Sequence, residues 1–368
     1  MTSHPFFLRI VLFVVFTGLF IPGVLHGNPT ARETIGPRFQ DVPLPKTLAL
    51  CGEPMPLEIP SVREMLDREL TISAWDAAQV FMWLKRAGRY FPHIERRLRE
   101  EGMPEDLKYL AVAESALLTH IRSRKGALGT WQFMPYTARS HGLRKDRAMD
   151  ERRNFERSTE AALKYLKTLK EMFGSWTLAM AAYNCGEARL KKEIKRQKVN
   201  SYYKLNLPLE TERYIFRIAT AKLIMEDPGG YGYTLPEERE YKPIDCDTVK
   251  VHIRAPVPIA DVAQSLGTYY KIIKELNPQV RGYDFPSGRY SIKVPAGLGS
   301  KLASALKQHS RKAPRKTTNL ADGRYVVRPG DTLSHISQRT RVPVATLKDL
   351  NGLDSSVIRI GQRLRLHR

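Results

Sequence analysis

The chain has 368 residues, too many for one small domain, and 42% of them are hydrophobic, so two or three buried cores can form. Its formal net charge of +22 predicts an anionic partner or surface: nucleic acid, anionic lipid or an acidic cell-wall polymer. The elements expected along the chain narrow this choice.

Residues 1–27 have the pattern of an export signal or N-terminal anchor. Arg9 precedes an apolar run from Ile10 to Ile21, and proline and glycine follow it. A cut after Gly27 would place Leu25 where a small residue is preferred, so retention as an uncleaved anchor stays open, although the run is short for a membrane span. We expect an exported protein of the periplasm or cell envelope, with membrane association through the N-terminus as an alternative. Export argues against nucleic acid.

Residues 28–60 are rich in proline, lack periodicity and are predicted to form a linker. An oxidising compartment permits one disulfide among the three cysteines. Cys51 and Cys246 flank the central region, so we predict that they form it. Cys185 follows an apolar helical pattern and is expected to pack as a small hydrophobic residue.

Residues 61–240 are predicted to be all-α. Helical patterns occupy most of 61–101, and further helices are expected after Pro104 and Ser158, over the apolar segment WTLAMAAYN, over the basic segment RLKKEIKRQK and over about 210–225. The segment WTLAMAAYN is apolar nearly all round, which predicts a central buried helix. The basic segment is either a solvated helix or an electrostatic contact with the polymer.

The C-terminal part changes to strand-like runs and repeats itself. The segment 259–277 aligns with 333–351 at a constant offset, which pairs Ile259 with Leu333 and Asn277 with Asn351. Each copy reads strand, helix, helix, strand, over 245–298 and 324–368. The basic stretch 299–323 between them is predicted to be a flexible linker.

Glu114 is the candidate for chemistry, because it lies among apolar positions of a predicted helix that include Leu107, Leu110 and Ala111. A carboxyl group in apolar surroundings has a raised pKa and can act as a general acid near neutral pH. Glycoside cleavage needs such an acid to protonate the leaving oxygen. The downstream acids Asp146, Asp150 and Glu151 lie in a charge-rich segment and are expected to be solvated, so a second catalytic carboxylate is not evident.

Three segments carry a resemblance: AVAESALLTHIRSRKGALGTWQFMPYTA, AMAAYNCGEARL and LPLETERYIFRIATAKLI. Together they resemble the catalytic domain of soluble-type lytic transglycosylases, the family 23 glycoside hydrolases. The C-terminal segment YVVRPGDTLSHISQRTRVPVATLKDLNGLDSSVIRIGQRLRL is similar to a LysM domain. The resemblance implies a multidomain protein with an all-α lysozyme-like catalytic domain followed by small α+β (βααβ) LysM-type modules.

The resemblance also implies roles for residues. Glu114 matches the catalytic glutamate, which would cleave the bond between N-acetylmuramic acid and N-acetylglucosamine and leave 1,6-anhydromuramyl ends. The residues that would bind substrate are Ser115, Ser123, Gln132, Met134, Tyr183, Asn184 and Tyr214. In the LysM-like unit the glycan would lie between two loops, formed by Gly330, Asp331, Thr332 and Leu333 and by Asn351, Gly352 and Leu353. The first copy lacks the P-G-D-T start and is interpreted as a degenerate unit that can be purely structural.

We therefore expect a peptidoglycan lytic transglycosylase, a monomer that binds glycan strands and needs no cofactor or metal. Two alternatives remain. One is a hydrolytic muramidase on the same fold, which would use a second active-site carboxylate. The other is a non-catalytic wall-binding protein, against which the set of Glu114, Ser123, Gln132, Tyr183 and Asn184 argues.

Overall fold

The computed structural model describes residues 42–312, 323–327 and 331–367. The predicted signal or anchor, 1–27, lies outside the described residues. Within the described residues, none of the helices is both long and apolar enough to cross a bilayer.

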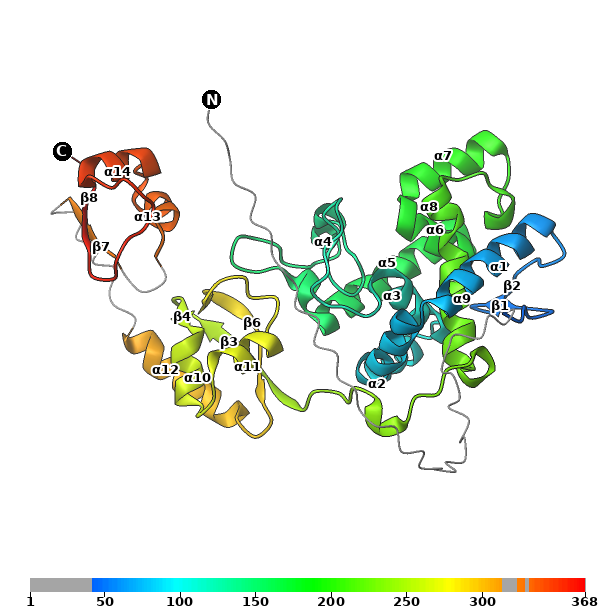
Figure 1. Ribbon diagram of the computed structural model, residues 1–368, viewed down its shortest axis with the longest axis horizontal. Helices are drawn as coiled ribbons and strands as arrows, with labels where there is room; N and C mark the ends of the chain where they lie inside the picture. The colour runs from blue at the N-terminus through cyan, green and yellow to red at the C-terminus, as the bar shows by residue number, and fades with distance from the viewer. Residues whose placement is uncertain (1–41, 313–322, 328–330, 368) are drawn as a thin grey trace, which may run out of the picture. The chain divides into compact units, whose positions relative to one another are not determined.

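The helical domain is built mainly from α-helices, as predicted (Figure 1). Its helices are α1 (Pro60–Trp75), α2 (Ala77–Glu100), α3 (Lys108–Ser115), α4 (Pro135–Ser140), α5 (Phe155–Phe173), α6 (Trp176–Cys185), α7 (Glu187–Gln197), α8 (Leu209–Glu212) and α9 (Tyr214–Glu226). Short 3-10 turns join them, η1 (Glu105–Leu107), η2 (Glu151–Arg153), η3 (Tyr202–Lys204), η4 (Gly229–Tyr231) and η5 (Glu237–Arg239).

Helix α6 is the buried centre of this domain. It contacts α5, α7, α8 and α9, and its residues from Thr177 to Ala182 are all buried. The side chain of Ser175 caps its start by accepting a hydrogen bond from the amide of Leu178. The prediction of a central buried helix is confirmed, because an apolar surface on all sides leaves a helix no face for solvent.

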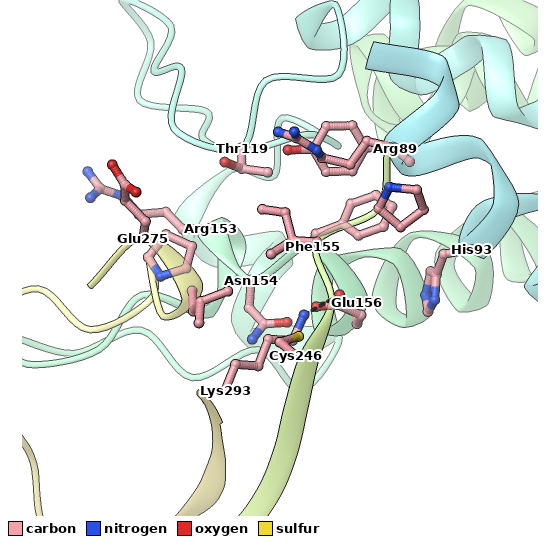
Figure 2. Close-up of a pocket in the computed structure, with 15 residues that line it drawn as sticks. Arg89, His93, Thr119, Arg153, Asn154, Phe155, Glu156, Cys246, Glu275 and Lys293 are labelled. Atoms are coloured by element: carbon pink, nitrogen blue, oxygen red, sulfur yellow. Dashed lines mark hydrogen bonds and ion pairs between the residues drawn. The ribbon is translucent and has the colours of Figure 1, made fainter. Parts of the chain in front are cut away.

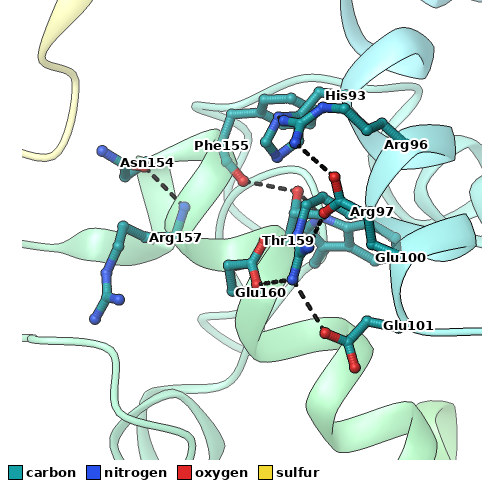
Figure 3. Close-up of polar contacts among 11 residues, drawn as sticks. His93, Arg96, Arg97, Glu100, Glu101, Asn154, Phe155, Arg157, Thr159 and Glu160 are labelled. Atoms are coloured by element: carbon teal, nitrogen blue, oxygen red, sulfur yellow. Dashed lines mark hydrogen bonds and ion pairs between the residues drawn. The ribbon is translucent and has the colours of Figure 1, made fainter. Parts of the chain in front are cut away.

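A cluster of charges joins α2 to α5 (Figure 3). Arg97 on α2 donates from Nε to Oε1 of Glu160 on α5 at 2.5 Å and from Nη2 to Oε2 at 2.8 Å. Asn154 caps α5 by accepting a hydrogen bond from the amide of Arg157 at 2.9 Å. The pair of Arg97 and Glu160 holds α5 against α2, and the Asn154 cap fixes the residue at which α5 begins.

The linker predicted over 28–60 is wrong for the residues from 42 onward. Strands β1 (Ala49–Leu50) and β2 (Glu53–Pro54) pair as a hairpin, and Leu50, Met55 and Leu57 are buried in the core of the helical domain. A proline-rich segment without periodicity can still pack when its few apolar side chains meet a core built by other elements.

Two modules follow, and each contains the predicted order of strand, helix, helix, strand; the first also has two further short strands and a final helix. The first module comprises β3 (Cys246–Ile253), β4 (Val257–Pro258), α10 (Ile259–Ser265), α11 (Tyr270–Leu276), β5 (Asp284–Phe285), β6 (Gly288–Pro295) and α12 (Gly299–Lys312). The second comprises β7 (Arg324–Val326), α13 (Leu333–Thr340), α14 (Val344–Asn351) and β8 (Arg363–Arg365). In the first, β3 and β6 are antiparallel over their whole lengths, with Cys246 opposite Pro295. In the second, β7 and β8 are antiparallel.

Helix α12 corrects the flexible linker predicted over 299–323. Its side chains Leu302, Ala305 and Leu306 are buried in the core of the first module. Ala305 and Leu306 lie three and four positions after Leu302, on one face of a helix, and the basic residues that flank them, such as Lys301 and Lys307, gave the segment the composition of a linker. Residues 313–322 of the predicted linker lie outside the described residues.

The predicted disulfide is not formed. Cys51 is buried in the core of the helical domain, Cys246 begins β3 of the first module, and both are free thiols. Burial raises the pKa of the Cys51 thiol, so it remains protonated. Cys185 packs against the core of the helical domain, as predicted.

Candidate functional site

Glu114 lies at the end of α3, in the last turn of the helix. The predicted apolar neighbours Leu107, Leu110 and Ala111 are fully buried, so this face of α3 is directed into the domain core. After Ser115 the backbone turns abruptly, with φ of 52° at Ala116 and 62° at Leu117. Left-handed backbone at two successive residues with side chains is strained, and such strain gathers at functional sites.

The environment of Glu114 raises the pKa of its carboxyl group toward neutral pH. Its Oε1 accepts a hydrogen bond of 2.5 Å from the hydroxyl of Tyr214, the first residue of α9. Burial raises the pKa of Glu114 to about 7, and the charge of Glu210 adds to this effect. The hydrogen bond from Tyr214 and the positive charge of Arg217 act in the opposite direction, but burial outweighs them.

The segment 121–134, here called the site loop, is fastened to the helices by buried hydrogen bonds. Ser115 donates its hydroxyl to the carbonyl of Thr130 at 2.8 Å, and Tyr183 donates to the carbonyl of Trp131 at 2.7 Å. The indole of Trp131 is fully buried and donates to Oγ1 of Thr159 at 3.0 Å. Ser115 and Tyr183, both predicted to bind substrate, thus shape the site loop. Ser115 is 6% exposed, which leaves it little surface for a ligand.

Ser123 and Gln132 also hold the site loop in shape. Oγ of Ser123 accepts a hydrogen bond from the amide of Ala127 at 3.0 Å. Nε2 of Gln132 donates to the carbonyls of Ile121 and Gly129, at 3.1 and 2.7 Å. Gln132 itself has a φ of 46°, so its conformation is sustained by these contacts. The side chain of each is thus engaged within the loop.

Met134 and Asn184, the remaining predicted substrate residues, differ in exposure and contacts. Met134 is 42% exposed, and Tyr136, two residues further on in α4, is 77% exposed, so the end of the site loop and the start of α4 offer apolar surface. Oδ1 of Asn184 accepts a hydrogen bond from the hydroxyl of Thr211 at 2.9 Å. That contact joins the end of α6 to α8, which carries Glu210.

Arg152 is the residue that the sequence analysis missed. Its guanidinium is 4% exposed and donates from Nη1 to the carbonyls of Gly126 and Phe133, both at 2.9 Å. Its other nitrogens donate to the two carboxylate oxygens of Asp150 at 2.8 Å. Asp150 is 4% exposed, so the expectation that it is solvated is wrong. The signal was the spacing Asp-x-Arg, which is too common in sequences to single out a buried pair.

The LysM-like residues are largely committed to their own fold. Thr332 caps α13 by accepting from the amide of His335, and Leu333 is buried. The carboxylate of Asp331 accepts from the hydroxyl of Tyr325 at 2.8 Å. Gly352, at a φ of 60°, ends α14 and precedes the half-buried Leu353. Gly330 lies outside the described residues.

A small pocket lies where the first module meets the helical domain (Figure 2). Its cavity volume is about 200 Å³, and it is lined by residues that include Arg89, His93, Phe155, Cys246 and Lys293. Glu114 is not among the residues that line this pocket. Among the described residues, no three His, Cys, Asp or Glu side chains gather closely enough to hold a metal ion.

Comparisons with known proteins agree with this arrangement. Residues 91–206 match the transglycosylase SLT domain, and residues 325–366 match the LysM domain. The chain is 35% identical over 290 residues to membrane-bound lytic murein transglycosylase D of Escherichia coli strain K12. That match covers 76% of this chain and 63% of the relative, so the chain spans less than two thirds of the relative's length.

Two solved structures of lytic transglycosylases are also similar. The 70 kDa soluble lytic transglycosylase of Escherichia coli is 17% identical, over 49% of this chain and 32% of that one, with a TM-score of 0.34. An inactive mutant of lytic transglycosylase Slt from Pseudomonas aeruginosa is 20% identical, over 41% of this chain and 26% of that one, with a TM-score of 0.30.

Proposed function

We propose that this chain, which carries a transglycosylase SLT domain and a LysM domain, is a lytic transglycosylase that cleaves the glycan strands of peptidoglycan. The observation that carries the proposal is the environment of Glu114: burial holds its pKa at about 7, and Tyr214 orients its carboxyl group. A carboxyl group of this kind can donate a proton at neutral pH and then accept one.

The reaction has two proton transfers on one residue. Glu114 protonates the oxygen of the bond between N-acetylmuramic acid and N-acetylglucosamine, and the bond to C1 breaks. The carboxylate so formed takes the proton of the muramyl C6 hydroxyl, whose oxygen bonds to C1 and closes the 1,6-anhydro ring. No water is consumed, and Glu114 is again protonated at the end. Tyr214 stabilises the carboxylate between the two steps by its short hydrogen bond.

The site loop would support the sugar rings. Met134 and Tyr136 expose apolar surface on which the face of a sugar ring can pack. The hydrogen bonds of Ser115, Ser123, Gln132 and Tyr183 hold the loop's backbone, so we propose that they act on the substrate chiefly by preorganising that loop. The backbone groups of Asp331–Leu333 and Asn351–Leu353 would bind acetamido groups of the glycan in the second module.

An envelope location follows from this substrate, since peptidoglycan lies outside the cytoplasmic membrane. The relative from Escherichia coli is named as membrane-bound, which accords with the apolar N-terminal run of this chain. Attachment through that run and a monomeric state are proposals on the same footing. The net charge of +22 suits a wall polymer whose stem peptides carry carboxylates.

The test is mass spectrometry of muropeptides released from purified peptidoglycan. The wild-type chain is expected to release 1,6-anhydromuramyl ends, and Glu114→Gln to lower the rate by about 100- to 10,000-fold, the usual worth of a general acid and base. Glu210→Gln is the matched control, because Glu210 is the other carboxylate whose charge reaches Glu114. It should still release anhydro ends.

Other products would contradict the proposal in distinguishable ways. Reducing ends that disappear in Glu210→Gln would identify a muramidase with water as nucleophile and Glu210 as the second carboxylate. Glycan binding without any released product would identify a non-catalytic wall-binding protein.

A further inference from the structure

The first module has the same internal bracing as the second, so their positions can be compared residue by residue. Nδ2 of Asn277 donates to the carbonyls of Ile273 and Lys293, and its Oδ1 accepts from the amide of Lys293. Asn351 makes the same three bonds, to the carbonyl four residues before it and to the carbonyl and amide of Arg365. The two copies therefore correspond in structure as well as in sequence.

This alignment shows where a glycan groove would lie in the first module. The loops that we propose to bind glycan in the second module correspond to Pro256–Ile259 and Asn277–Gln279 in the first. The first of these loops is already paired inside the module. Strand β4 is antiparallel to β5, and the amide of Ile259 donates to the carbonyl of Tyr283 at 2.9 Å. The backbone groups of this first loop therefore already form hydrogen bonds within the module.

The other side of the groove is taken by the helical domain. The amide of Asp150 donates to the carbonyl of Gln279 at 2.8 Å, and the amide of Arg281 donates to the carbonyl of Ala148 at 2.8 Å. Met149 lies opposite Val280 in an antiparallel bridge and is 1% exposed, buried in the core of the first module. A strand-like segment of the helical domain thus occupies the place that corresponds to the glycan.

Further contacts hold the two parts together beside this segment. Lys293 of β6 forms an ion pair with Glu156 of α5, and Figure 2 shows the two side chains pointing toward one another. The chain leading to the module is pinned to α2, because the amide of Tyr241 donates to the carbonyl of Lys85 at 2.8 Å. The module is therefore docked at several points.

From these contacts we propose that the first module is a positioning module: it binds the segment 148–150 where its counterpart would bind glycan, and so holds the site loop in its productive shape. The route is short. Asp150, clamped through its backbone, orients Arg152, and Arg152 holds the carbonyls of Gly126 and Phe133 in the site loop. Arg152 is the positioning residue, because it acts on the site loop and not on the reacting atoms.

Close packing makes this route sensitive to small movements. A Cβ added at Gly129 in the site loop would come within 1.9 Å of the carbonyl oxygen of Arg152, so the loop rests directly on this backbone. A buried ion pair such as Asp150 and Arg152 tolerates little change in geometry, because its desolvation is offset only when every hydrogen bond is made. A shift of the segment 148–150 is therefore expected to move the site loop.

The first test loosens the segment 148–150 from the first module without changing Glu114 or any residue of the site loop. Met149→Ala in the full chain should speed amide hydrogen exchange of 126–133. It should also lower kcat for peptidoglycan cleavage by about tenfold to a hundredfold, as expected for a misplacement of about 1 Å, while KM stays near the wild-type value. Met149→Leu refills the volume and should restore both. Leu302→Ala is the control, since it opens the same core from α12 and leaves the residues of the segment 148–150 unchanged.

Met149→Ala with unchanged exchange and unchanged kcat would overturn the proposal. So would a loss of kcat that Leu302→Ala reproduces in full, since that would reflect general weakening of the module. The exchange measurement does not need an active protein, so it tests the positioning role of the first module even if the proposed function is wrong. Failure of the proposed function would be recognised separately, because the wild-type chain itself would then be inactive.

The second test asks whether the groove is filled. It rests on the proposed function, and it uses the full-length Glu114→Gln chain with a tetramer of N-acetylglucosamine as probe. Hydrogen exchange should slow at 351–353 and stay unchanged at 277–281. Protection at 277–281 would overturn the proposal, because the groove would then be open to glycan. Protection at neither segment would speak against glycan binding by the second module and leave the groove filled as proposed.

Discussion

Tyr214 donates its hydroxyl to the carboxyl group of Glu114 at 2.5 Å, across one hundred residues of sequence. Burial is the largest influence on the pKa of each side chain. It raises the pKa of Tyr214 well above its usual value and that of Glu114 to about 7. The tyrosine stays neutral and remains a donor over the whole working range. The pair therefore couples a titrating acid to a fixed hydrogen-bond donor.

Tyr214→Phe should move the pH dependence of cleavage. In the wild type the hydrogen bond from Tyr214 lowers the pKa of Glu114. The variant lacks this bond, so the pKa of Glu114 should rise further. A hydrogen bond to a charged group is worth about 1.5–3 kcal/mol, which corresponds to about one pH unit or more. The alkaline limb of kcat/KM, near pH 7 in the wild type, should move upward by that amount. A pH–rate profile measures it.

Tyr183→Phe is the matched control for this prediction. Its hydroxyl donates to the carbonyl of Trp131 and not to Glu114. The variant should lower kcat by loosening the site loop and leave the alkaline limb in place. An equal displacement of the limb in both variants would contradict the specific role assigned to Tyr214.

Glu114→Gln should stabilise the folded protein at alkaline pH. The pKa of Glu114 in the folded state, about 7, lies above the usual 4.5. The folded wild type therefore has its full stability from this group below pH 4.5, and its free energy of unfolding falls as the pH rises through 7. Glutamine does not titrate, and the variant should gain on the order of 2 kcal/mol relative to wild type between pH 5 and pH 8. Urea unfolding at the two pH values measures the difference. A gain that is the same at both values would argue that Glu114 is ionised in the fold.

Gly129→Ala should disrupt the site loop. Gly129 has a φ of 88° and rests against the carbonyl of Arg152, so a methyl group meets both backbone strain and a clash. We expect a loss of about 2 to 5 kcal/mol in the free energy of unfolding. Gly142→Ala is the control, because Gly142 has a φ of 77° with open space around the added carbon. It should lose only about 1–2 kcal/mol, and losses of equal size would refute the close contact.

Glu53→Gln should weaken the start of α6. The carboxylate of Glu53 accepts hydrogen bonds from the amides of Trp176 and Thr177, at 2.5 and 3.0 Å. Burial alone would raise the pKa of Glu53, but these bonds outweigh it and lower the pKa. The variant should lose about 1–2 kcal/mol at pH 7.

The pH dependence of this loss provides its check. Because the folded pKa is depressed, the stabilisation by Glu53 is present above pH 4.5 and disappears as the pH falls. The free energies of unfolding of the wild type and Glu53→Gln should differ strongly at pH 7 and only slightly at pH 3. Glu58→Gln, an exposed carboxylate nearby, is the control and should change neither value; a comparable loss there would contradict the capping role.

Local patterns in the sequence predicted much of the architecture. Apolar spacing at Leu107, Leu110 and Ala111 predicted the buried face of α3, and the nearly uniform apolar segment predicted the central helix α6. The repeated spacing around Asn277 and Asn351 predicted two modules of one kind. These features depend on period and composition, which neighbouring residues determine.

Features that depend on distant partners could not be predicted in this way. The packing of 42–60 and α12 needed a core supplied by other elements. Cys51 is separate from Cys246 because Cys51 is buried in the core of the helical domain, whereas Cys246 begins β3 of the first module. Asp150 had every local sign of a solvated acid, yet it is buried.

The sequence by itself determined most helices of the helical domain, the two modules and the candidate acid Glu114, because each leaves a periodic or local trace in the chain. Only the tertiary structure decided the partners: Tyr214 on Glu114, Arg152 on Asp150, and Met149 in the core of the first module. The physical reason is that burial of a charge, and so its pKa, is set by atoms that packing brings from far along the sequence.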